Sequence, residues 1–175
     1  MIARTHGANV FLLPGEFQFG EAPGRIGTLL GSCVAVTVWH PLRRFGGMCH
    51  ILLPSRRRPP ASLPDCRYAD EAIERFVYEL RARREAPSGC QVKLFGGGNM
   101  FDGSPAANLD IGGRNIAATR KALAFLGFGQ VVAEHVGGRL RRRLWLDLSS
   151  GQVRLALPND PLSSPVGEMA WTKSA

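Results

Sequence analysis

Short segments in which apolar and polar side chains alternate recur along this chain, and glycine or proline usually ends them. After Cys33, for example, Val34, Val36 and Val38 alternate with other side chains until Pro41. Alternation with a period of two is typical of β-strands, so the chain is expected to be rich in strands. The expected strands cover residues 9–13, 34–39, 47–53, 91–95, 130–136, 143–148 and 152–157.

The connections between these segments decide which kind of sheet they form. Residues 34–39 and 47–53 are expected to pair as a hairpin-like unit, and residues 149–151 to form the tight turn of a second hairpin. A Gly/Pro-rich loop is expected between residues 14 and 32, and a polar surface loop over residues 56–64. Because strands and helices do not alternate regularly, a doubly wound nucleotide-binding sheet is disfavoured.

Two segments carry the helical period instead. Between Tyr68 and Arg84, apolar residues recur three and four positions apart, which predicts an amphipathic helix. A second helix is expected from Arg114 to Leu126, where Gly127 provides a C-terminal cap. The expected fold class is therefore mixed α/β (α+β), a layered sandwich of mixed β-sheets with helices packed on the outside.

The length of 175 residues fits one domain with its own hydrophobic core. We expect this domain to span residues 1–157, and residues 158–175, which show no periodicity, to form a mobile tail. An apolar share of 45% and a charged share of 21% are close to those of globular proteins, which argues against disorder. Neither a signal peptide nor an apolar stretch long enough for a membrane span is recognised, so a cytoplasmic location is expected.

The chain is strongly basic, with a formal charge of +8 that comes mostly from arginine. The arginines cluster at residues 56–58 and 139–143. Such runs bring nucleic acid into consideration, but no helix-turn-helix, zinc finger or RNA-binding aromatic signature accompanies them. We expect solvated turns or a surface for an acidic protein partner, with residues 141–143 as the candidate for attracting that partner, and no nucleic acid.

Four cysteines are candidates for a reactive thiol or a metal ligand: Cys33, Cys49, Cys66 and Cys90. They form no CxxC pair and have no histidine at the spacing of a structural zinc site, so no metal and no cofactor is expected. Reduced thiols of this kind are often small buried hydrophobic side chains. Cys33 differs because it stands where a glycine-containing loop becomes a strand, with His50 in the next strand.

A cysteine nucleophile needs a base, and His50 is the candidate because a hairpin would bring it onto one edge or face with Cys33. The oxyanion formed in the attack needs N–H donors, which the loop at Gly31 and Ser32 can supply. A third group usually holds the histidine tautomer. Thr28 is the candidate for this role, and the alternative is that its hydroxyl bonds its own turn. These residue types predict a cysteine hydrolase.

The same residues resemble the CheD family of chemoreceptor glutamine deamidases, over roughly residues 9–157. In some relatives the threonine stands six residues before the cysteine, where this chain has Gly27, and alanine is usual where this chain has Cys49. The segments that carry the resemblance are Thr28 to Val36 around the cysteine, Gly46 to Pro54 around the histidine, Arg67 to Ile73 at the first helix, Lys93 to Phe101 at a glycine run, and Ile111 to Asn115 at the second helix.

The resemblance implies that the chain converts selected glutamines of methyl-accepting chemotaxis receptors to glutamates through a cysteine thioester. It implies that Cys33, His50 and Thr28 form the catalytic triad, and that the chain meets the membrane only through its receptor substrates. The glycines at residues 96–98 lack a phosphate-binding motif and are expected to pack closely around the site. The alternative function is a non-catalytic module that docks on receptors or on a CheC-type phosphatase.

Overall fold

Nine strands, two α-helices and one 3-10 turn make up the residues that this computed structural model describes, which are 9–100 and 110–158. In chain order the elements are β1 (Asn9–Leu12), β2 (Phe17–Glu21), β3 (Arg25–Leu30), β4 (Val34–His40), β5 (Phe45–Ile51), α1 (Ala69–Ala82), η1 (Pro87–Gly89), β6 (Gln91–Gly96), α2 (Ile111–Phe125), β7 (Val131–Val136), β8 (Arg142–Asp147) and β9 (Val153–Ala156).

The strands form two sheets. The five-stranded sheet has the order β2-β5-β4-β6-β7, and the four-stranded sheet has the order β1-β3-β8-β9. The β4–β5 and β8–β9 pairs are antiparallel, as the two predicted hairpins require, whereas β1–β3 and β6–β7 are parallel. Both sheets are therefore mixed, which confirms the predicted sheet type.

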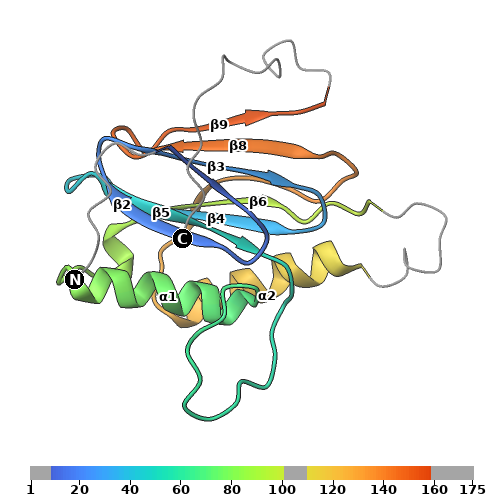
Figure 1. Ribbon diagram of the computed structural model, residues 1–175, viewed down its shortest axis with the longest axis horizontal. Coiled ribbons are helices and arrows are strands. Elements are labelled where there is room, and N and C mark those ends of the chain that lie inside the picture. The colour runs from blue at the N-terminus through green and yellow to red at the C-terminus, as the bar shows by residue number, and fades with distance from the viewer. Residues whose placement is uncertain (1–8, 101–109, 159–175) are drawn as a thin grey trace.

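The elements are stacked in three layers, with both helices on one face of the five-stranded sheet and the four-stranded sheet on its other face (Figure 1). Successive side chains of β4 point to opposite faces of the five-stranded sheet, so this strand contributes to the core on both faces. Val34, Val36 and Val38 pack with the helices, and Ala35 packs toward the other sheet. The hydrophobic core accordingly has two parts, one under the helices and one between the sheets. This arrangement confirms the predicted layered sandwich with outer helices.

The helices follow the sequence pattern closely. Phe76 on α1 is completely buried, and Phe17 of β2 packs edge-on against it with ring centroids 4.8 Å apart. At the end of α2, Gly127 has a φ of +82°, and the N–H of Phe128 donates to the carbonyl of Leu123. Glycine therefore caps this helix as predicted. Neither helix in the described part of the chain is long and apolar enough to cross a membrane.

One prediction about the strands is wrong. The stretch between residues 14 and 32, expected to be a loop, contains β2 and β3. The alternation of β3 is hard to see in the sequence because the positions that point away from the core include Gly27 and the exposed Leu29 rather than polar residues alone. The predicted mobile tail lies outside the described residues from residue 159 onward, and the single-domain organisation stays a prediction.

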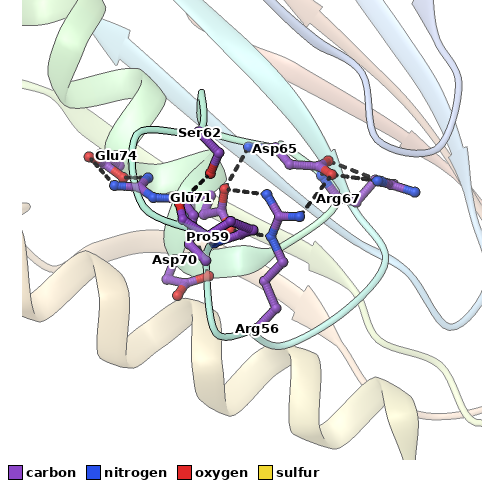
Figure 2. A network of polar contacts seen from close by, with 9 residues as sticks. Arg56, Pro59, Ser62, Asp65, Arg67, Asp70, Glu71 and Glu74 are labelled. Carbon is purple, nitrogen blue, oxygen red and sulfur yellow. Dashed lines mark hydrogen bonds and ion pairs between the residues drawn. The ribbon is translucent and has the colours of Figure 1, made fainter.

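The polar loop between β5 and α1 is held to α1 by carboxylates (Figure 2). Nε of Arg56 donates to Oε1 of Glu71 over 2.7 Å, and the N–H of Asp65 donates to Oε2 of Glu71 over 2.7 Å. The side chain of Glu71 is only 3% exposed, so these donors replace the water that the carboxylate has lost. The hydrogen bond from Arg56 is the main cause that lowers the pKa of Glu71. Farther along the loop, Arg58 pairs with the more exposed Glu74.

The Glu71→Gln variant is expected to open this loop to proteases, because it removes the charge that holds Arg56 against α1. Trypsin added to the native protein should cut after Arg57 several-fold faster than in the wild type, as followed by mass spectrometry of the fragments. Glu74→Gln removes the more exposed pair and should be cut at nearly the wild-type rate. Equal cleavage of the wild type and Glu71→Gln would mean that other contacts hold the loop.

Candidate active site

The connection between β3 and β4 carries the chain from one sheet to the other, and Cys33 lies on it. Thr28 and Leu30 of β3 are buried on the side that faces the other sheet. Residues 31–33 then form a series of bends, and Val34 begins β4. Cys33 is half-buried and packs against the core between the sheets. This candidate nucleophile therefore stands at the end of the inter-sheet layer, where it is not fully buried.

His50 reaches the same place from β5. In the β4–β5 ladder it lies opposite Ala35, which is two residues after Cys33. Side chains two residues apart share one face of a strand, and diagonal partners across an antiparallel pair are within reach of long side chains. The predicted hairpin therefore places Cys33 and His50 at the same end of the strand pair, facing the other sheet.

Thr28 contacts His50 from the opposite sheet. Its Oγ1 lies 2.8 Å from Nδ1 of His50 and donates to the carbonyl of Leu12 over 2.9 Å. The single proton of the Thr28 hydroxyl is donated in the hydrogen bond to the Leu12 carbonyl. Toward His50 the hydroxyl oxygen therefore accepts a hydrogen bond from Nδ1–H. This pattern assigns the Nδ1–H tautomer and leaves the Nε2 lone pair able to accept a proton. Of the two alternatives for Thr28, the contact with His50 is present, and the other partner is on β1 rather than in its own turn.

Burial keeps the thiol and the imidazole uncharged. His50 is 2% exposed, and its burial lowers its pKa to about 4. Its Nε2 is buried and has no hydrogen-bond partner among the described residues. Burial also raises the pKa of the Cys33 thiol above its ordinary value. At neutral pH the protein therefore holds a thiol and a neutral imidazole, not a thiolate–imidazolium pair.

The glycine run after β6 fixes the backbone of Cys33. The N–H of Gly97 donates to the carbonyl of Cys33 over 2.7 Å, and the N–H of Gly98 donates to the carbonyl of Gly31 over 2.9 Å. Gly96 has a φ of +99°, and a Cβ there would lie 2.2 Å from the carbonyl oxygen of Cys33, which no side chain allows. The expected close packing of these glycines around the candidate site is present.

The amides of the predicted oxyanion loop lie between two carbonyls that the glycine run holds. Gly31 and Cys33 use their carbonyls to accept from the glycine run. Within residues 9–100 and 110–158, neither the N–H of Ser32 nor that of Cys33 donates to a carbonyl outside the strand ladders. Two backbone donors next to a thiol are the kind of group that stabilises a developing oxyanion.

The other three cysteines lie away from this arrangement. Cys49 is buried in the core under the helices, on the face of β5 opposite to His50, as strand alternation predicts. Burial raises the pKa of Cys66 and of Cys90 to about 11, and raises that of Cys49 further. The described ranges contain no group of three or more His, Cys, Asp or Glu side chains that could bind a metal ion.

Comparison with known proteins finds a family for this chain. Residues 52–156 match the CheD family, described as CheD chemotactic sensory transduction. A protein of Dechloromonas aromatica (strain RCB), named probable chemoreceptor glutamine deamidase CheD 3, is 51% identical over 85% of this chain and 87% of its own length. The chain belongs to the CheD family.

A second CheD protein, from Pseudomonas syringae pv. syringae (strain B728a), is named probable chemoreceptor glutamine deamidase CheD and is 45% identical over 83% of this chain and 82% of its own. Among solved structures, the Bacillus licheniformis hypothetical protein YfiH aligns over 75% of this chain and 60% of its own, with a TM-score of 0.43 and 11% identity. The CheD match begins two residues after His50, and the catalytic roles of Cys33, His50 and Thr28 stay predictions.

One member of the predicted basic patch, Arg142, is not on the surface, whereas Arg141 is exposed and Arg143 is partly exposed. Arg142 is 2% exposed, so it cannot attract a partner from solvent. The alternation of β8 turns it to the same side as Leu144 and Leu146, in the core between the sheets. The sequence prediction begins this strand at Arg143, one residue too late, and so treats Arg142 as part of an exposed run. An earlier strand start would have placed Arg142 inside.

Proposed function

We propose that this CheD protein is a chemoreceptor glutamine deamidase, which hydrolyses the side-chain carboxamide of selected receptor glutamines to a carboxylate and ammonia. The observation that carries the proposal is the hydrogen bond between Thr28 and His50, which leaves an unpartnered imidazole nitrogen at the end of the sheet where Cys33 lies. The names of the CheD relatives, probable chemoreceptor glutamine deamidases, support this substrate class.

The reaction begins with Cys33 and His50 uncharged. As the sulfur attacks the carboxamide carbon, Nε2 of His50 takes the thiol proton, and the N–H groups of Ser32 and Cys33 receive the oxyanion. The imidazolium then gives this proton to the departing nitrogen, ammonia leaves, and a thioester to Cys33 remains. His50 next removes a proton from water, which attacks the thioester. Glutamate and the free thiol are the products.

The function is tested by incubating the purified chain with a purified receptor cytoplasmic fragment. Mass spectrometry of receptor peptides should show a gain of about one dalton at specific glutamines, with release of an equal amount of ammonia. Intact receptor peptides, together with stable binding of the fragment, would instead favour the non-catalytic module. Binding of a CheC-type phosphatase and the cytoplasmic location stay predictions beside this one.

The neutral thiol–imidazole pair predicts how Cys33 reacts with iodoacetamide in the free protein. Because burial raises the pKa of Cys33 and lowers that of His50, the alkylation rate should climb with pH through the alkaline range. It should show no plateau at mildly acidic pH. Peptide mapping should find Cys33 labelled before Cys49, Cys66 and Cys90. A pH-independent rate between pH values of about 5 and 7 would indicate a preformed ion pair and contradict this prediction.

A further inference from the structure

Arg142 is a buried arginine that none of the proposed chemical steps uses. It begins β8, pairs with Leu30 in the β3–β8 ladder, and is 2% exposed. Leu30 directly precedes the bends that lead to Cys33, so the guanidinium lies in the same end of the inter-sheet layer. An arginine keeps its charge in proteins, and burying a charge is costly unless the fold gains something from it.

The acceptors of this guanidinium are all uncharged. Nε donates to Nδ1 of His135 over 2.7 Å, Nη1 donates to the carbonyl of Leu140 over 2.9 Å, and Nη2 donates to the carbonyl of Gly137. No carboxylate of the described residues forms an ion pair with Arg142. Burial lowers its pKa, as expected for a charge without an anionic partner. The planar fork thus ties one side chain, that of His135, and two backbone carbonyls, those of Gly137 and Leu140, to the start of β8.

The segment between β7 and β8 in turn holds the glycine run. The N–H of Gly137 donates to the carbonyl of Gly96 over 2.9 Å, and the N–H of Asn99 donates to the carbonyl of Gly138 over 2.8 Å. A Cβ on Gly98 would lie 3.5 Å from Nη1 of Arg142, so the guanidinium also borders the glycine run directly.

The glycine run holds the nucleophile loop through two further hydrogen bonds, from Gly97 to the carbonyl of Cys33 and from Gly98 to the carbonyl of Gly31. An unbroken series of hydrogen bonds therefore leads from Arg142 to the backbone on both sides of Ser32. The amides between those two carbonyls are the proposed oxyanion donors.

We propose that Arg142 is a positioning residue of the deamidase, which fixes the turn at Gly137 and, through the glycine run, the nucleophile loop at Cys33. The expected effect of Arg142 on turnover rests on the proposed function. Its expected effect on the nucleophile loop is independent of that function. A shift of the oxyanion donors and the thiol by a fraction of an ångström reduces stabilisation of the transition state more than it reduces receptor binding. The turnover number should therefore depend on Arg142, and the Michaelis constant should not.

The test compares Arg142→Met, Arg142→Lys and the control Arg154→Met in the full chain. Arg154 lies on the neighbouring strand β9 and is exposed. For Arg142→Met, kcat with a receptor fragment should fall about a hundredfold at unchanged KM, a loss of the size expected for misplaced reacting groups. Arg142→Lys should lose nearly as much, because one ammonium cannot reach three acceptors held by a planar fork. Arg154→Met should behave as the wild type.

Hydrogen–deuterium exchange of the same proteins without receptor provides the second readout. Peptides that contain Gly97 and Gly98 should exchange faster in both Arg142 variants, while peptides from α1 keep wild-type protection. Wild-type kcat in Arg142→Lys, a raised KM at unchanged kcat, or unchanged exchange at the glycine run would each overturn the proposal. If the wild type does not deamidate receptors, the proposed function fails, and the exchange experiment still decides the role of Arg142.

Discussion

Replacing Cys33 with alanine is expected to abolish deamidation while the protein stays folded. The thiol is the one group proposed to form a covalent bond to the substrate, and the hydroxyl of the adjacent Ser32 is a far weaker nucleophile at neutral pH. The rate should fall by about a thousandfold or more, because the oxyanion donors and receptor binding alone leave little catalysis. The measurement is the mass gain of receptor glutamines over time. Cys33 is half-buried, so its loss should change the melting temperature little.

Cys49→Ala is the matched control for that experiment. Cys49 is adjacent to His50 in sequence, but its side chain lies in the core under the helices. The variant loses a buried thiol and some stability, yet the folded fraction should deamidate at the wild-type rate. Wild-type activity in Cys33→Ala would show that Cys33 is not the nucleophile. Loss of activity in folded Cys49→Ala would also contradict the assignment.

Replacing His50 with glutamine should lower kcat by about a hundredfold to ten-thousandfold, the range typical of a lost general acid–base group. Glutamine cannot take the thiol proton at neutral pH, because its amide is not a base. His40→Gln is the control, since His40 is also buried but lies at the far end of β4, where its Nε2 is 3.4 Å from Oε2 of Glu85. Equal activity of His50→Gln and the wild type would remove His50 from the mechanism.

His50→Gln should also change how the free energy of unfolding depends on pH. His50 has a pKa of about 4 in the folded protein and an ordinary value of 6.5 when unfolded, so between these pH values the unfolded chain binds one more proton. Wild-type stability should therefore decrease as the pH falls from about 6.5 to 4, by roughly 3 kcal/mol from this group. His50→Gln should lack that contribution. Urea unfolding at several pH values measures it.

Much of the fold could be predicted because its central strands alternate clearly. The valines of β4 and the proline after it define both the strand and its face, and α1 shows a full apolar stripe. The strand β2 was missed although Phe17 and Phe19 alternate with Gln18 and Gly20, because glycines and prolines on both sides favoured a loop, and in β3 Gly27 and Leu29 hide the period. The consequence was that Thr28, expected in a loop, stands on a strand of the second sheet.

The candidate site was predictable where neighbours in sequence are neighbours in space. The β4–β5 hairpin places His50 opposite Ala35, two residues after Cys33, so local spacing was enough to suggest the pair, while Nε2 of His50 forms no hydrogen bond with the described residues. Arg142 is different, because it is more than a hundred residues away from Cys33 and reaches the nucleophile loop through two other turns. Its polarity suggested the surface, whereas the alternation of β8 turns it inward once the strand is taken to begin at Arg142.

The contact between Thr28 and His50 has one more consequence. In many catalytic triads the third residue is a carboxylate, whose negative charge favours the imidazolium form of the histidine. Here the acceptor is a hydroxyl oxygen whose proton is committed to the carbonyl of Leu12. The hydrogen-bond partner that orients the ring therefore carries no charge, and the only carboxylate of the described residues that acts on His50 is Glu16, whose charge raises the pKa of His50 less than burial lowers it. A turnover would thus start from four electrically neutral partners, namely thiol, imidazole, hydroxyl and carboxamide, and the first anion to form would be the oxyanion for which the Ser32 and Cys33 amides are the proposed donors.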